Sequence, residues 1–348
     1  MRVLFWTYPA AFQAPGGGET ILLKSREYLE AAGVQVDVFD QWSTKLRDYP
    51  LVHCFHSNYP EFWESVHHAK GRLVVTPTHW PVTNAKIRSW RWLKRRGRTL
   101  FGARGPDKDI GYFYSLADAI LPSSATERSL LHRYCRVPLD KMTVVRNGVD
   151  PRFVNARPDA FVQQYGLSNF VLCVGRFTPN KNQLSVIRAL KGCEAPLVFI
   201  GTEDPEAGDY LERCRSEAGP NVHFLGWIDH DSPLLPAAFA AARVFLLPSV
   251  VDIASLAALE AAAAGCRLVV TPVGSSREYY AQHAFYVDPH SETDIREKTY
   301  AALTSERPRQ PGDIDIPTWA DVAGQLRAVY ERLLGEQRPG RADAAFRS

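Results

Sequence analysis

Residues 170–182 read FVLCVGRFTPNKN and join a short apolar run to two cations. The run at 170–174 is typical of a buried strand, and Gly175 follows it directly. Arg176 and Lys181 then lie on the loop before the next helix, at the sheet edge where doubly wound folds bind ligands. Arginine offers phosphate oxygens a bidentate fork and lysine adds a compact charge, which suits a diphosphate. The alternative is an ordinary solvated loop, because most charges lie at the surface.

A second segment places two carboxylates at the start of a helix. Residues 246–278 read LLPSVVDIASLAALEAAAAGCRLVVTPVGSSRE, in which Asp252 and Glu260 stand eight residues apart. With a helix beginning near Ser255, Glu260 lies just over one turn inside it, near the unpaired backbone N–H groups. One interpretation is a diphosphate at that helix end with a ribose beside Glu260. The other is that Glu260 only complements the helix dipole.

Strands alternate with helices on both sides of these segments. We expect strands at 3–6, 34–38, 51–55, 72–76, 117–122, 142–145, 170–174, 197–200, 222–225, 244–247 and 268–271. We expect helices at 19–32, 125–134, 182–190 and 256–264. This alternation predicts an α/β fold in which parallel sheets are covered on both faces.

The length of 348 residues favours two domains, because one core rarely grows beyond about 250–300 residues. Residues 147–158, NGVDPRFVNARP, carry two prolines and no helical periodicity, so we place the interdomain connection there. Apolar residues recur with helical spacing between Trp319 and Leu334. We therefore expect the following parts: domains at 1–155 and 156–317, a helix at 318–335 and a flexible tail at 336–348.

Composition is that of an ordinary globular protein, with 45% hydrophobic and 23% charged residues. The opening MRVLFWTYPA has too short an apolar run for a signal peptide, and no uncharged apolar stretch approaches the length of a spanning helix. Six scattered cysteines without a CxxC pair fit a reducing compartment and give no support to a zinc site. We therefore expect a cytoplasmic protein.

Several motifs together resemble one known family. GRFTPNK at 175–181, PSVVDIASLAALEAAAAG at 248–265 and TPVGSSRE at 271–278 follow ADAILPSSATERSLLHRY at 117–134 and VVRNGVD at 144–150. In this order and spacing they resemble the retaining GT-B glycosyltransferases of glycosyltransferase family four. The resemblance implies two Rossmann-like domains facing a cleft, with the final helix returning to the first domain. It also implies that the first domain receives the acceptor and the second binds the donor.

The resemblance implies a role for individual residues. Arg176 and Lys181 would hold the donor diphosphate, Glu260 the ribose hydroxyls, and Asp252 the hydroxyls of the transferred sugar. Further donor contacts are implied for Gly17, Gly18, Ser255 and Leu256, and for the backbone of Gly226, Trp227 and Ile228 at the base. His79, in TPTHW, matches a histidine beside the reacting sugar, whereas His56 is more consistent with packing or the acceptor side.

The sequence departs from the family pattern at two places. Most members have glutamate where Asp252 stands, followed by a glycine, an aromatic residue and a glycine, but here Ile253, Ala254 and Ser255 follow. Aspartate reaches about one methylene less far than glutamate, which is consistent with an altered donor, a water-bridged sugar contact or weakened catalysis. Asn182 also replaces the usual glycine after Lys181.

The resemblance implies that the chain transfers a hexose from a UDP- or GDP-linked donor to a hydroxyl of a glycan or lipid-linked acceptor. The expected context is cell-surface polysaccharide or glycolipid biosynthesis, with retention and without a metal or other cofactor. Two alternatives stay open: a nucleotide-sugar epimerase on the same fold, and a non-catalytic protein that binds sugar nucleotides.

A basic, tryptophan-containing stretch needs its own explanation. Residues 86–104 hold eight cations and no acidic residue. The candidate contacts with an acceptor or an anionic membrane surface are Arg88, Trp90, Arg91, Trp92, Lys94, Arg95 and Arg96. Cations meet anionic headgroups while tryptophans settle at the interface, so we expect a peripheral contact with the inner face of the cytoplasmic membrane. A solvated loop is the alternative, and nucleic acid is not expected as a partner because no nucleic-acid-binding module accompanies the stretch.

Overall fold

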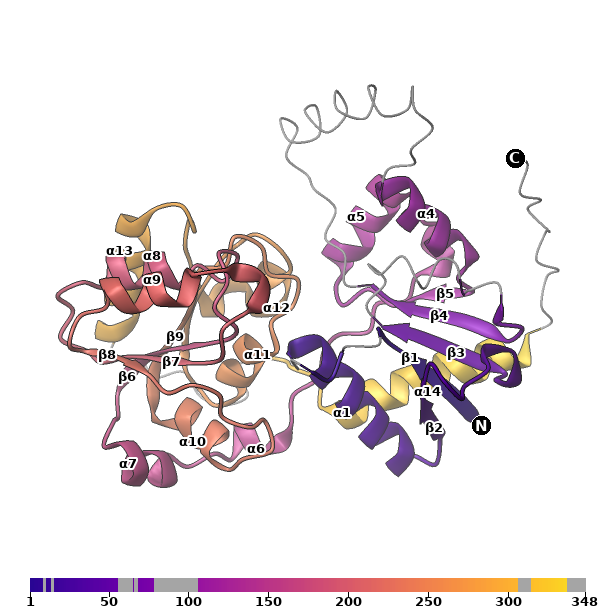
Figure 1. Cartoon of the computed structure of the whole chain (residues 1–348), viewed down its shortest axis with the longest axis horizontal. Helices are drawn as coiled ribbons and strands as arrows, with labels where there is room; N and C mark the ends of the chain where they lie inside the picture. The colour runs from indigo at the N-terminus through magenta and orange to yellow at the C-terminus, as the bar shows by residue number, and fades with distance from the viewer. Residues whose placement is uncertain are drawn as a thin grey trace, which may run out of the picture.

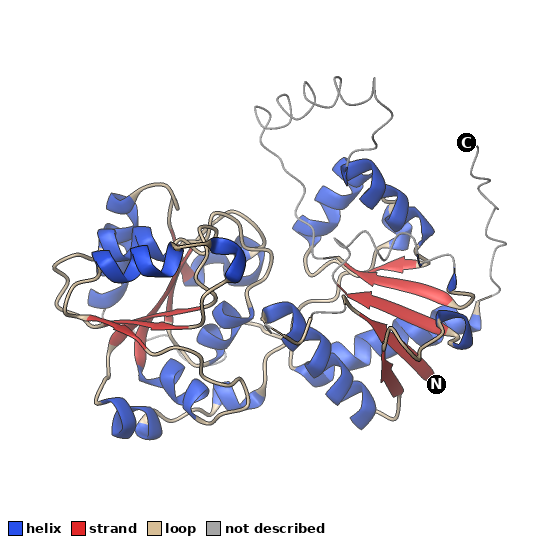
Figure 2. Ribbon diagram, in the orientation of Figure 1, coloured by secondary structure: helices blue, strands red, loops and turns tan. Residues whose placement is uncertain are grey.

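A computed structural model gives the structure of the protein and describes residues 1–8, 11–13, 16–55, 65, 68–77, 106–305 and 314–336. Two parallel β-sheets form its framework (Figure 1 and Figure 2). The first has the strand order β2-β1-β3-β4-β5 and the second β11-β10-β9-β6-β7-β8. The predicted α/β class with two Rossmann-like units is confirmed.

The first sheet carries helices on both faces. Its strands are β1 (Arg2–Trp6), β2 (Gln35–Val38), β3 (Leu51–Phe55), β4 (Arg72–Thr76) and β5 (Ala119–Ile120). Its helices are α1 (Gly17–Ala31), α4 (Pro106–Leu116) and α5 (Ala125–Cys135), with short 3₁₀ turns η1 (Leu46–Asp48) and η3 (Leu139–Lys141). In Figure 1, α4 and α5 lie on one side of the sheet and α1 on the other.

The second sheet is also covered on both sides. Its strands are β6 (Phe170–Val174), β7 (Leu197–Ile200), β8 (Val222–Phe224), β9 (Ala242–Leu247), β10 (Arg267–Val270) and β11 (Ala284–Tyr286). Its helices are α6 (Pro151–Val154), α7 (Asp159–Tyr165), α8 (Gln183–Ala189), α9 (Tyr210–Glu217), α10 (Leu234–Ala241), α11 (Leu256–Ala263), α12 (Ser276–Tyr280) and α13 (Glu292–Thr304), with 3₁₀ turns η4 (Pro205–Ala207) and η5 (Ala281–His283).

Strand β6 shows why the sequence gives this layering. Successive side chains of a strand point to opposite faces of the sheet. Phe170 and Leu172 pack into the core under α10 and α11, whereas Val171 and Cys173 pack into the core under α8, α9 and α13. Both faces are buried, so the strand reads as a continuous apolar run rather than an alternating one.

The last helix, α14 (Trp319–Gly335), returns to the first sheet as expected, and it packs against α1. Its apolar stripe, including Trp319 and Tyr330, is buried. The Tyr330 hydroxyl lies 2.6 Å from Nδ1 of His53 on β3, and burial lowers the pKa of His53 to about 3. Thr318 caps the helix start, because its hydroxyl accepts from the Asp321 backbone N–H. Among the described helices, none has the length and apolar character needed to cross a membrane.

The structure corrects three expectations. Residues 142–145 form no strand, because β5 stops before Pro122 and only Met142 makes an isolated bridge to Ile120. The second sheet has a strand beyond 267–270, the short β11. The helix α6 occupies part of the connection at 147–158, where Asp150 accepts from the Arg152 backbone N–H and caps it.

Helices α5 and α12 join the two units directly. Glu278 of α12 accepts hydrogen bonds from the backbone N–H groups of Ala125 and Thr126, at 2.7 and 2.9 Å. It therefore caps α5 from the opposite unit. The buried hydroxyls of Ser124 and Ser275 lie 2.8 Å apart beside this contact.

Glu127, also buried at this junction, makes the stability of the fold depend on pH. Its Oε2 accepts from the backbone N–H and the hydroxyl of Ser123, whereas Oε1 is buried with no hydrogen-bond partner among the described residues. Burial raises the pKa of Glu127 to about 7 from an ordinary 4.5. The folded state therefore favours the neutral acid, and the contribution to stability present below pH 4.5 is lost as the pH rises through 7.

We expect Glu127→Gln to remove this loss, because glutamine is neutral and of similar shape. Relative to the variant, the wild type should lose on the order of 2–3 kcal/mol of unfolding free energy between pH 4.5 and pH 8. Denaturant unfolding of both proteins at the two pH values measures the difference. Other titrating groups, including His53, are common to both proteins and cancel. If the difference in unfolding free energy between the wild type and Glu127→Gln is the same at both pH values, the raised pKa of Glu127 is contradicted.

Candidate functional site

A cavity of about 480 Å³ lies between the two sheets and is lined from both units. Its size is that of a small-molecule site. The first unit contributes Gly16, Gly17, Gly18, Thr20, Ile21, Thr76, Pro77 and Ser123, and Asn147 of the connection also lines it. From the second unit come the ends of β6 and β7, the loop before α11 and the start of that helix. The predicted residues Arg176, Lys181, Asp252 and Glu260 all line this one cavity.

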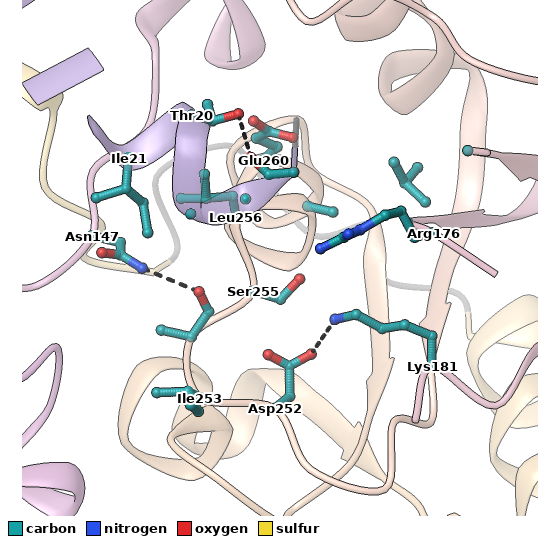
Figure 3. Close-up of a pocket in the computed structure, with 18 of the residues that line it drawn as sticks. Thr20, Ile21, Asn147, Arg176, Lys181, Asp252, Ile253, Ser255, Leu256 and Glu260 are labelled. Atoms are coloured by element: carbon teal, nitrogen blue, oxygen red, sulfur yellow. Dashed lines mark hydrogen bonds and ion pairs between the residues drawn. The ribbon is translucent and has the colours of Figure 1, made fainter. Parts of the chain in front are cut away.

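Arg176 and Lys181 enter the cavity from the same side, with their nitrogen ends pointing toward Ser255 and Asp252 (Figure 3). They follow β6, as the sequence predicts. Nη1 of Arg176 lies 3.5 Å from Oδ2 of Asp204, and Nζ of Lys181 lies 3.4 Å from Oδ2 of Asp252. Each cation is thus held at the cavity wall by a carboxylate.

Helix α11 begins where the sequence predicts. Ser255 is its N-cap, because the Ser255 hydroxyl accepts from the Ala258 backbone N–H at 3.3 Å. The open end of the helix, with Leu256 and Ala257, lines the cavity. Glu260 lies just over one turn inside and is 7% exposed. The helix therefore presents both its N-terminal dipole and a carboxylate to the cavity.

Asp252 is fixed by its backbone. Its N–H donates to the Val273 carbonyl, and its own carbonyl accepts from the Ser275 N–H. A side chain at Gly274 would put its Cβ 1.7 Å from that carbonyl oxygen, so only glycine allows the approach. The Asp252 carboxylate is 8% exposed and lies 3.5 Å from the Ser249 hydroxyl. The predicted contact with the transferred sugar stays a prediction.

The structure explains why asparagine can replace glycine at 182. Asn182 has φ = 64°, the left-handed conformation that asparagine tolerates better than most residues. Its amide donates to the carbonyl oxygens of Pro248 and Pro289, at 3.2 and 2.7 Å. The substitution therefore ties the loop after Lys181 to the segment before Asp252.

The glycine segment of the first unit closes the cavity opposite Arg176. Helix α1 begins at Gly17, two residues earlier than expected, because Glu19 folds back and accepts from the Gly16 N–H at 2.7 Å. A Cβ at Gly16 would lie 3.3 Å from Nη2 of Arg176. A Cβ at Gly17 would meet nothing within 4 Å, so this position opens onto free space.

Gly17→Ala should separate stability from activity. Alanine favours helix by up to about 1 kcal/mol over glycine, so thermal stability should stay the same or rise. We expect kcat/KM to fall about tenfold, because the methyl group occupies space that the glycine leaves to a ligand. Gly324→Ala in α14, where a Cβ also meets nothing within 4 Å, is the control and should keep normal turnover. Normal kcat/KM in Gly17→Ala would contradict the prediction.

The predicted base-contacting segment is only partly in the cavity. Trp227 and Ile228 line it, and Trp227 remains 48% exposed. Gly226 does not line it, and its carbonyl instead accepts from the Gly201 N–H at 2.8 Å. Gly226 therefore shapes the loop that carries the other two residues.

The cavity residues that the sequence did not predict include His230, Asp204 and Asn147. His230 lies 2.8 Å from Glu260, Asp204 pairs with Arg176, and the Asn147 amide donates to the Ala254 carbonyl at 3.1 Å. Only Asn147 carried a signal, since it belongs to the VVRNGVD motif. A lone histidine and a loop aspartate have no spacing that marks them.

Several predicted residues lie outside the described part of the chain. These are His79, His56 and the basic contacts Arg88, Trp90, Arg91, Trp92, Lys94, Arg95 and Arg96. Their roles stay predictions.

Comparison with known proteins gives matches for both units. The family model described as Glycosyl transferases group 1 matches residues 168–305, and the one described as Glycosyltransferase Family 4 matches residues 40–153. An uncharacterized glycosyltransferase, MJ1607 of Methanocaldococcus jannaschii, is 34% identical over 170 residues, which is 43% of this chain and 42% of that protein. The O-antigen chain mannosyltransferase B of Escherichia coli is 26% identical over 199 residues, 53% of this chain and 51% of that protein. The chain thus spans about half the length, or less, of these curated relatives.

A solved structure shares the whole fold. Anabaena Alr3699/HepE, in complex with UDP and glucose, superimposes with a TM-score of 0.74 at 16% identity, covering 95% of this chain and 99% of that one. The two family models cover well over half of the chain between them, one for each sheet. The chain therefore belongs to the glycosyltransferases that these two models describe, and it has the GT-B fold.

Proposed function

We propose that the protein is a retaining glycosyltransferase that moves a hexose from a UDP- or GDP-linked donor to a hydroxyl of a glycan or lipid-linked acceptor. The observation that carries the proposal is the convergence of Arg176, Lys181 and Glu260 on one cavity between the two units. Two cations for a diphosphate and a carboxylate for a ribose are the groups that a nucleotide sugar needs. The complex of HepE with UDP and glucose supports a nucleotide-sugar donor.

In the proposed reaction, the bond from the sugar C1 to the β-phosphate oxygen breaks. A bond from the acceptor oxygen to C1 forms on the same face, and the acceptor proton passes to the departing diphosphate. Arg176, Lys181 and the N-terminus of α11 stabilise the charge that develops on that diphosphate. His79 and Asp252 are proposed to contact the sugar.

Fixed cations make a metal unnecessary in this proposal. Arg176 and Lys181 supply the positive charge that a divalent ion supplies in carboxylate-based sites. We expect full turnover in the presence of a chelator.

The proposed acceptor side is the first unit, and the proposed context is cell-surface polysaccharide or glycolipid synthesis at the inner face of the cytoplasmic membrane. The similarity to an O-antigen chain mannosyltransferase supports the polysaccharide context. The basic stretch at 86–104 supports a contact with anionic lipid.

A donor panel tests the proposal. Purified protein is incubated with UDP- and GDP-linked hexoses, and free nucleotide, epimers and bound ligand are measured. Slow release of nucleoside diphosphate from one donor is the expected result. Epimer formation would indicate an isomerase instead, and binding without release would indicate a non-catalytic protein.

A further inference from the structure

His230 lies between two charged side chains at one end of the cavity. It belongs to the segment between β8 and α10, and its Nε2 atom lies 2.8 Å from Oε1 of Glu260. Its Nδ1 atom lies 2.9 Å from Nη2 of Arg152. Nη2 of Arg152 also donates to the backbone carbonyl oxygen of His230. Arg152 and Glu260 therefore hold the imidazole from opposite edges.

This arrangement fixes which ring nitrogen carries the proton. Arginine nitrogens only donate hydrogen bonds, so Nδ1 of His230 must accept from Arg152. The neutral ring then has its proton on Nε2, and Nε2–H donates to Glu260. A proton on Nδ1 would point at a guanidinium N–H, which has no lone pair to accept it.

The hydrogen bond from His230 engages one of the two carboxylate oxygens of Glu260. Oε1 accepts from His230, whereas Oε2 has no hydrogen bond or ion pair within the part of the chain that the structure describes. Glu260 lines the cavity and is 7% exposed. With Oε1 anchored, the carboxylate cannot rotate freely, and Oε2 is offered in one orientation.

Arg152 is itself held in place. It stands on α6, in the connection between the two sheets, with Asp150 and Asp231 carboxylates at 3.6 and 3.7 Å. Lys24 of α1 lies 3.5 Å from each of these two carboxylates, so the cluster balances its charges. Arg152 does not line the cavity, whereas His230 does. Arg152 therefore reaches the cavity through His230, because it contacts both the ring and the backbone carbonyl of that residue.

We propose that Arg152 and His230 are positioning residues for ribose recognition. Arg152 sets the His230 tautomer, His230 anchors Oε1 of Glu260, and the remaining oxygen accepts from a ribose hydroxyl. The site thereby distinguishes a ribonucleotide from its 2′-deoxy analogue. This inference rests on the proposed function, because it takes the ligand to be a nucleoside diphosphate.

Calorimetric binding to the full-length protein tests the proposal, with UDP against 2′-deoxy-UDP and GDP against 2′-deoxy-GDP. The wild type should prefer the ribose form of the base that it binds by about 10- to 100-fold, because a buried carboxylate loses its hydroxyl partner. In Arg152→Met and in His230→Leu the preference should fall close to parity. The double variant should be no worse than either single one, since the two residues act in series. If one variant does not fold, the other carries the test.

Two controls separate positioning from general structural damage. His230→Gln keeps a donor that can reach Glu260 and should restore most of the preference. Inorganic pyrophosphate has no ribose, so we expect it to bind all variants as it binds the wild type. A variant that binds the ribose and 2′-deoxyribose nucleotides more weakly by the same factor, so that the ratio of the two affinities is unchanged, would overturn the positioning role. Equal affinity of the wild type for the ribose and 2′-deoxyribose nucleotides would also overturn the positioning role, but it would leave the proposed function standing. Absence of any nucleotide or pyrophosphate binding to the wild type would overturn both.

Discussion

Arg176→Ala and Lys181→Ala are each expected to lower kcat about 10²- to 10³-fold while the protein stays folded. The Arg176 guanidinium and the Lys181 ammonium face one cavity beside the N-terminal end of α11 (Figure 3). Positive groups fixed before the reaction stabilise a leaving diphosphate without having to reorganise, so their removal acts on the transition state. Steady-state kinetics with the best donor, together with thermal unfolding of each variant, measures both parts of the prediction.

Lys181→Ala has a second consequence that needs its own control. Removing the ammonium leaves the Asp252 carboxylate, 8% exposed, without the cation that lies 3.4 Å away. That carboxylate would then repel a diphosphate. Lys181→Ala combined with Asp252→Asn removes both charges, and a loss of kcat relative to Asp252→Asn alone belongs to the missing cation.

A surface cation provides the matched control. Lys191 follows α8, is exposed and does not line the cavity, so Lys191→Ala should keep normal kcat. Near-normal turnover in both Arg176→Ala and Lys181→Ala would contradict the assignment of the diphosphate site.

Glu260→Ala should weaken nucleoside diphosphate binding about 10- to 100-fold, as expected for loss of a hydrogen bond to a charged group. Pyrophosphate binding should not change, because pyrophosphate has no ribose and its proposed contacts are Arg176 and Lys181. Glu260→Gln should have a smaller effect, since the amide oxygen can still accept from His230 and the NH2 group can donate to a ribose hydroxyl oxygen. Calorimetry with nucleoside diphosphate and with pyrophosphate measures the contrast. Equal losses for the two ligands would mean that Glu260 holds the fold of the site and not the ribose.

Strands buried on both faces were the most predictable part of the fold. Residues 51–55, 72–76, 170–174 and 197–200 form strands with the predicted limits, because central parallel strands are continuous apolar runs. The short edge strand β11, Ala284–Tyr286, is only partly buried and has no such run. Residues 142–145 lie beside β5, and the N–H groups of Thr143 and Val145 donate to the carbonyl oxygens of Ile120 and Pro122. Only one bridge forms, because Pro122 has no N–H with which to continue the ladder.

Some residues of the site were also predictable from the local sequence, and others were not. Arg176, Lys181 and Glu260 were predictable because each lies at a fixed position after a strand or inside a helix start. His230 was not, because its position depends on contacts with Arg152 and Glu260, which lie 78 and 30 residues away in the sequence. Such long-range contacts leave no local pattern. The start of α1 at Gly17 was missed for a related reason, since it depends on Glu19 folding back onto Gly16.

A crystal structure with bound UDP or GDP tests the central claim most directly. We expect the phosphate oxygens to lie within hydrogen-bonding distance of the Arg176 guanidinium and the Lys181 ammonium, and a ribose hydroxyl to donate to Glu260. A nucleotide bound outside this cavity, or bound in it with its phosphates turned away from both cations, would contradict the account.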